Sequence, residues 1–139
     1  MSDQNLVWIS AIDSGNKVPT SERVLKAVIA KVALEDQLDL DASRAFIGGF
    51  SGGAKVSTVV MKHYPKAYRG GVFIGGSYAW GDGSGDTDLD GLAMTNRYVF
   101  LTGRDDFNRK EILSHARGYR SKGAANVKVM DIGLSLIHI

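Results

Sequence analysis

The feature that most constrains the fold is a regular alternation of short apolar runs with longer amphipathic segments. The apolar runs end in turn residues and predict buried strands, whereas the longer segments repeat apolar side chains at helical spacing. The predicted strands are residues 6–11, 44–48, 71–74, 98–102 and 127–132, and the predicted helices are residues 20–38, 54–64 and 107–122. Strands that alternate with helices form right-handed crossovers, so we expect an α/β fold: a central parallel sheet of about five strands, flanked by helices.

Composition narrows the functional classes. A length of 139 residues fits one domain with its own core. The 17 basic and 15 acidic residues are scattered, so no basic stripe points to nucleic acid or to an anionic membrane surface. No apolar stretch approaches the roughly 18 residues of a membrane span. The lack of cysteine excludes disulfides, zinc–thiolate sites and a thiol nucleophile, while localisation and oligomeric state stay open.

One motif stands between a predicted strand and a predicted helix: Gly49-Phe50-Ser51-Gly52-Gly53, which matches G-x-S-x-G. In such a sharp turn the serine takes a strained backbone conformation, and we expect side chains at the outer glycine positions to collide with it. The following helix points its first amides at the serine, so the N–H of Gly52 is a candidate oxyanion donor. The alternative is a glycine-rich turn whose serine has no chemical role.

Two longer stretches of the chain have distinctive sequences. They are Ala45-Phe46-Ile47-Gly48-Gly49-Phe50-Ser51-Gly52-Gly53 and Phe100-Leu101-Thr102-Gly103-Arg104-Asp105-Asp106-Phe107-Asn108-Arg109. Both resemble α/β-hydrolases of the polyhydroxybutyrate-depolymerase-like esterase group, as do residues 39–44, and the resemblance spans residues 6–132. It implies a partial α/β-hydrolase fold and a serine hydrolase without a cofactor. Such an enzyme cleaves small or polymeric carboxylic esters, or related acyl bonds, through an acyl-enzyme on Ser51.

The resemblance also implies where the acid of a catalytic triad stands. Its order along the chain is serine, acid, histidine, and the acid follows the strand predicted at residues 98–102. By resemblance Asp106 is this acid, which would orient a histidine and stabilise its imidazolium, and Asp105 is the reserve candidate. Either aspartate could instead cap the helix that follows.

The histidine base is not found where the resemblance places it, in a loop after the last strand. His63 and His115 fall on predicted helices. His138 lies within residues 134–139, Leu-Ser-Leu-Ile-His-Ile, which are also one translation of a common sequencing adapter. We therefore expect a non-native tail there, with His138 beyond hydrogen-bond reach of Ser51.

The resemblance further implies that the family's sheet extends beyond this chain. The predicted strand at residues 6–11 corresponds to the family's fourth strand, so three strands and the second oxyanion donor would lie upstream. We expect residues 1–133 to be a partial α/β-hydrolase domain truncated at both ends, inactive by itself because the catalytic histidine is missing. Two other functions stay open: a non-catalytic binding module and a peptidase of the same fold.

Residues 75–96 are rich in glycine and aspartate and predict a long loop. Asp86, Asp88 and Asp90 fit the opening of a calcium-binding loop, but Arg97 stands where such a loop places a glutamate. A solvated acidic loop is therefore the simpler interpretation, and no metal is expected.

Two aromatic residues follow the strand predicted at residues 71–74. Tyr78 and Trp80 would lie at the carboxyl edge of the sheet, where ligands bind in open α/β folds. They are candidates for lining a substrate pocket, and packing within the loop is the alternative.

Overall fold

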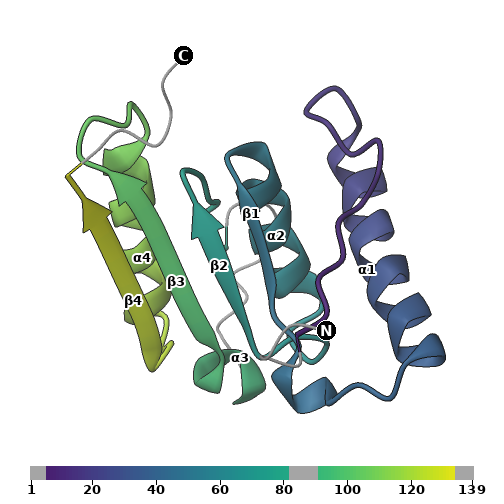
Figure 1. The fold of residues 1–139 in the computed structure, drawn as a ribbon. Coiled ribbons are helices and arrows are strands. Elements are labelled where there is room, and N and C mark those ends of the chain that lie inside the picture. The colour runs from purple at the N-terminus through teal and green to yellow at the C-terminus, as the bar shows by residue number, and fades with distance from the viewer. Residues whose placement is uncertain (1–5, 82–90, 134–139) are drawn as a thin grey trace. The chain divides into compact units, whose positions relative to one another are not determined.

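The computed structural model describes residues 6–81 and 91–133. The chain divides into two compact units, Met1–Leu40 and Asp41–Ile139, which we describe one at a time (Figure 1). In the two described ranges, no helix combines the length and the apolar character needed to cross a membrane.

The first unit contains an extended segment and helix α1, Thr20–Gln37. Glu22 lies in the first turn of α1, where the helix dipole favours an acidic side chain. Ion pairs at i,i+4 spacing, Glu22 with Lys26 and Lys31 with Glu35, support the exposed face of the helix. The bounds agree closely with the helix predicted over residues 20–38.

The strand predicted at residues 6–11 is not formed, and this prediction is wrong. Its apolar side chains are exposed, with 70% of Leu6 and 80% of Trp8 accessible to solvent. A β-prone run becomes a strand only where a neighbouring strand accepts its hydrogen bonds, and residues 6–11 pair with none of the described strands. The sheet therefore has four strands among the described residues rather than about five.

The second unit alternates strands with helices around one parallel sheet. Its elements are a 3₁₀ turn at Ala42–Arg44, β1 Ile47–Phe50, α2 Gly52–His63, β2 Gly70–Ile74, α3 Gly91–Thr95, β3 Arg97–Gly103, α4 Arg109–Ser121 and β4 Asn126–Ile132. The strand order is β1-β2-β3-β4 and all three pairings are parallel. This is the expected α/β architecture, with the short helix α3 inside the segment predicted as a loop.

The first strand begins at Ile47, later than the predicted Arg44. The difference arises because Asp41 caps the 3₁₀ turn: its carboxylate accepts a hydrogen bond from the Ser43 backbone N–H at 2.9 Å. The bonds that Ser43 donates hold the pKa of the Asp41 carboxyl below its usual range. A short polar side chain that bonds to its own backbone competes with strand formation at these residues.

The helices that follow β1 and β3 cover one face of the sheet. Each strand pairs with the next one along the chain, and right-handed crossovers then place the connecting helices on the same side. Figure 1 shows α2 and α4 together behind the strands. On this face Phe73, Tyr98 and Phe100 are buried, and Tyr119 of α4 packs edge-on against Phe100 and Tyr98 with ring centroids 5.1 and 5.0 Å apart. Burial raises the pKa of Tyr98 to about 12.

The opposite face of the sheet carries a register row of apolar residues: Phe50, Ile74, Leu101 and Met130. Phe50 is 51% exposed and Met130 is 39% exposed. Because all four strands are parallel, their carboxyl ends meet at one edge of the sheet. The turns after β1, β2 and β3 therefore lie at a common edge, where open α/β folds bind ligands.

Candidate active site

Ser51 forms the whole connection between β1 and α2. Its backbone has φ 51° and ψ −116°, a positive φ that side chains rarely adopt and that costs about 1–3 kcal/mol. The Ser51 N–H donates to the carbonyl of Ile74 at 2.8 Å, and the Ser51 carbonyl accepts from Lys55 at 3.1 Å. The first bond continues the sheet and the second opens the helix, so the serine is fixed in the sharp turn that the motif predicts.

Glycines make this turn sterically possible, but only one outer glycine of the motif has that role. A Cβ on Gly49 would lie 2.4 Å from the Gly53 carbonyl carbon. A Cβ on Gly53 would meet nothing within 4 Å, so the expected collision at this position is wrong. Gly53 is the second residue of α2, and a side chain at this position would point into open space.

Gly76, outside the motif, is the second glycine that the serine turn requires. A Cβ at Gly76 would lie 2.5 Å from the Ser51 carbonyl oxygen. Gly75 and Gly76 follow β2, which is the neighbour of β1 in the sheet. The sequence shows a glycine pair after the next predicted strand. Its contact with Ser51 becomes apparent only when β1 and β2 are known to be neighbours in the sheet.

Gly52 is the first residue of α2. The first N–H groups of a helix have no acceptor within the helix, and the positive end of the helix dipole lies there. The Gly52 amide is therefore placed beside Ser51 with the polarity that an oxyanion needs. Its role as oxyanion donor stays a prediction.

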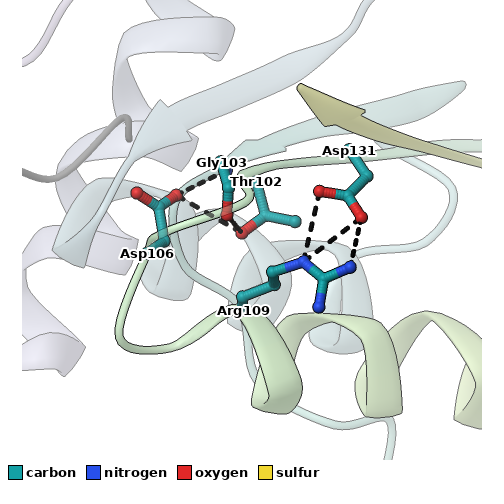
Figure 2. Close-up of polar contacts among 5 residues, drawn as sticks. All are labelled: Thr102, Gly103, Asp106, Arg109 and Asp131. Atoms are coloured by element: carbon teal, nitrogen blue, oxygen red, sulfur yellow. Dashed lines mark hydrogen bonds and ion pairs between the residues drawn. The ribbon is translucent and has the colours of Figure 1, made fainter. Parts of the chain in front are cut away.

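Asp106 lies in the turn between β3 and α4 and is 5% exposed. Its Oδ2 accepts from the Gly103 backbone N–H at 2.6 Å and from the Thr102 hydroxyl at 3.3 Å (Figure 2). Such bonds hold a buried carboxylate in one orientation. The N-cap of α4 is Asn108, so neither Asp106 nor the exposed Asp105 takes the capping position.

The start of α4 is tied to the end of β4 by an ion pair. The Arg109 guanidinium binds both carboxylate oxygens of Asp131, with Nε 3.2 Å from each (Figure 2). The bonds from Arg109 keep the pKa of the Asp131 carboxyl below its usual range, and the same bonds raise the pKa of Arg109. Thr102 and Asp131 are register partners, so this ion pair stands beside the turn between β3 and α4, residues 104–108, which we call the acid turn because it contains Asp106.

The described residues hold two of the three histidines. His63 is exposed in the last turn of α2, and His115 lies in the middle of α4 with its Nδ1 2.9 Å from the Ser77 hydroxyl. Neither follows β4, where the resemblance places the base. His138 and the expected tail, residues 134–139, lie outside the described residues.

Tyr78 and Trp80 both contact side chains of the helices α2 and α4. Tyr78 is 38% exposed, with its ring 5.3 Å from the Lys55 ammonium. Trp80 is buried and packs edge-on against Tyr119 at 5.2 Å. Both contacts are with helix residues rather than within the loop, and a substrate-binding role for the two residues stays a prediction.

The calcium candidates Asp86, Asp88 and Asp90 also lie outside the described residues. Within residues 6–81 and 91–133, no group of three or more acidic, histidine or cysteine side chains is placed to hold a metal ion.

Comparison with known proteins supports the fold. No protein-family model matches the sequence, and no curated protein matches it. Among solved structures, a thermostable esterase matches over 81% of this chain with a TM-score of 0.57 and 16% identical residues. The chain spans 29% of the length of that esterase. The likeness at this identity shows the fold, so the second unit's parallel sheet and flanking helices form a partial α/β fold shared with an esterase.

Proposed function

We propose that this chain carries the nucleophile and the acid of a serine hydrolase that cleaves carboxylic esters or related acyl bonds. The observation that carries the proposal is the positive φ of Ser51, which presents its hydroxyl at a strand-to-helix turn. The buried carboxylate of Asp106 stands at the same edge of the sheet, two strands away. A strained residue and a buried acid at one edge are typical of an active site.

In the proposed reaction, the Ser51 hydroxyl attacks the acyl carbonyl and gives its proton to a histidine. Asp106 accepts a hydrogen bond from that histidine and stabilises the imidazolium that forms. The Gly52 N–H donates to the oxyanion of the tetrahedral intermediate. The histidine then gives this proton to the leaving alcohol, and water hydrolyses the acyl-enzyme to release the acyl group from Ser51.

The test removes the nucleophile. In the full-length product of the gene, Ser51→Ala should lower kcat for p-nitrophenyl butyrate by about 10⁶-fold, the loss seen when a serine protease loses its nucleophile. A fluorophosphonate should label the unsubstituted protein on the peptide that contains Ser51 and should leave the variant unlabelled, as mass spectrometry would show.

The matched control is Ser57→Ala. Ser57 is buried on α2 and donates to the Gly53 carbonyl in its own helix, so labelling and turnover should persist in this variant. Full turnover in Ser51→Ala would refute the proposal. A protein that is neither labelled nor active would favour a binding module, and preferential cleavage of amides would favour a peptidase.

A further inference from the structure

Asn108 departs from the usual behaviour of an asparagine at the start of a helix. It is the N-cap of α4, a position where asparagine normally accepts a bond from the first turn, yet its side chain makes no cap bond. Its Nδ2 instead donates to the Gly75 carbonyl at 2.6 Å, 33 residues away in the sequence. The side chain is 7% exposed, and its Oδ1 has no hydrogen-bond partner among the described residues.

This arrangement lowers stability in two ways. The cap bond is given up, and a buried acceptor is left unsatisfied. Residues that depart from local rules in this way concentrate at functional sites, where the bond they make instead serves the site.

The bond from Asn108 connects the acid turn to the serine turn. Asn108 stands two residues after Asp106, and Gly75 is anchored in the sheet because its N–H donates to the Leu101 carbonyl at 2.8 Å. The next residue, Gly76, packs directly on Ser51, where an added Cβ would be 2.5 Å from the serine carbonyl oxygen. The contacts therefore run from the acid turn through Asn108 and the glycine pair to Ser51.

We propose that Asn108 is a positioning residue that sets the separation of Ser51 and Asp106 through its bond to Gly75. The inference rests on the proposed function. A strained serine turn keeps its geometry only if the surrounding structure holds it, and the Gly75–Gly76 segment is its neighbour on the side of the acid. Loss of the Asn108 bond frees the Gly75–Gly76 segment, and Ser51 is then misplaced although no reacting group has been removed.

Two variants keep the helix cap while they remove the bond. Asn108→Ser and Asn108→Asp both place good N-cap residues before α4, but serine is too short to reach the Gly75 carbonyl and aspartate presents only acceptors to it. In the full-length product of the gene, with an ester substrate, we expect kcat to fall about 100-fold, the effect of a shift of about 1 Å, with KM unchanged within about twofold.

Asn96→Ser is the matched control. Asn96 is 2% exposed and donates to the Pro65 carbonyl at 3.0 Å, so it makes the same kind of long-range bond just before β3, at the amino edge. It should lower the melting temperature and leave kcat unchanged. If both Asn108 variants keep full kcat, or if kcat falls equally in Asn96→Ser, the positioning role is refuted.

A second readout needs no turnover. Amide hydrogen exchange at Ser51, followed by NMR, should become about fivefold to tenfold faster in Asn108→Ser and should not change in Asn96→Ser. Unchanged protection of Ser51 in Asn108→Ser would overturn the inference. Full turnover in Ser51→Ala would remove the proposed function together with the inference, whereas loss of turnover there with intact kcat in both Asn108 variants would remove the inference alone.

Discussion

The two turns that carry the candidate residues keep their shapes by different means. The turn after β1 is Ser51 alone, and it fits because Gly76 leaves room for the Ser51 backbone and Gly49 leaves room for the backbone of Gly53 in the first turn of α2. The turn after β3, residues 104–108, is longer and is held by bonds that Asp106 accepts and Asn108 donates. Backbone hydrogen bonds and close packing against glycines hold the turn at Ser51, whereas side-chain hydrogen bonds hold the turn that contains Asp106. The two turns should therefore respond to different kinds of substitution.

The largest effect should come from added volume at the serine turn. In Gly49→Ala the new methyl group meets the Gly53 backbone at 2.4 Å, and backbone can relieve this contact only by moving. We expect the free energy of unfolding, measured by urea denaturation, to fall by about 3 kcal/mol. Ester turnover by the full-length product of the gene should be lost.

Gly53→Ala serves as the control for that substitution, because its methyl group enters open space at the start of α2. Its stability should equal that of the unsubstituted protein or exceed it by up to about 1 kcal/mol. Equal losses in the two variants would show that packing does not distinguish the two glycines of the motif.

At the acid turn, removal of an acceptor should matter more than volume. Asp106→Ala removes the carboxylate oxygen that accepts the Gly103 N–H at 2.6 Å, and Gly103 is buried, so its N–H loses its acceptor. The free energy of unfolding should fall by about 2 kcal/mol. If the proposed function holds, kcat of the full-length product of the gene should fall by about 10⁴-fold, the loss seen when a serine protease loses its triad aspartate. Asp105→Ala, at an exposed residue, should change stability by less than about 0.5 kcal/mol. A larger loss in Asp105→Ala than in Asp106→Ala would reverse the assignment.

The smallest effect concerns the ion pair beside the acid turn. Arg109 lowers the pKa of Asp131 from its ordinary value of 3.8. The unfolded chain therefore takes up a proton at higher pH than the folded chain does. The stabilisation is fully present above about pH 4 and is lost as the pH falls through the lowered value. Both side chains are about one-third exposed, so the melting temperatures of the native protein and Asp131→Asn should differ by less than about 4 °C at pH 6. They should converge as the pH falls through the lowered pKa of Asp131, and a gap that widens in acid would contradict this account.

Local patterns in the sequence predicted the parts of the molecule that local forces determine. Helices α1, α2 and α4 and the last three strands formed close to the predicted residues, because their periodicity and breakers lie within each segment. The turn at Ser51 was predictable for the same reason. Residues 6–11 had β propensity without a pairing partner, and propensity alone did not make a strand.

The contacts of the site that could not be predicted from the sequence join residues far apart along the chain. The bond from Asn108 to Gly75 spans 33 residues, and no spacing rule links the two. The local pattern indicates that the Asn108 side chain bonds to the first turn of α4, and the structure does not form this bond. The contact of Gly76 with Ser51 likewise exists only because β1 and β2 are neighbours.

The strand order has a consequence for how the chain folds as it is synthesised. Each strand pairs with its successor, so the sheet can grow in the order in which residues leave the ribosome. The sheet hydrogen bond of Ser51 needs only the pairing of β1 with β2 and does not depend on the turn that follows β3. If the sheet grows in this order, the bond from Asn108 is added last, to a serine turn that pairing with β2 and close packing against Gly76 have already shaped.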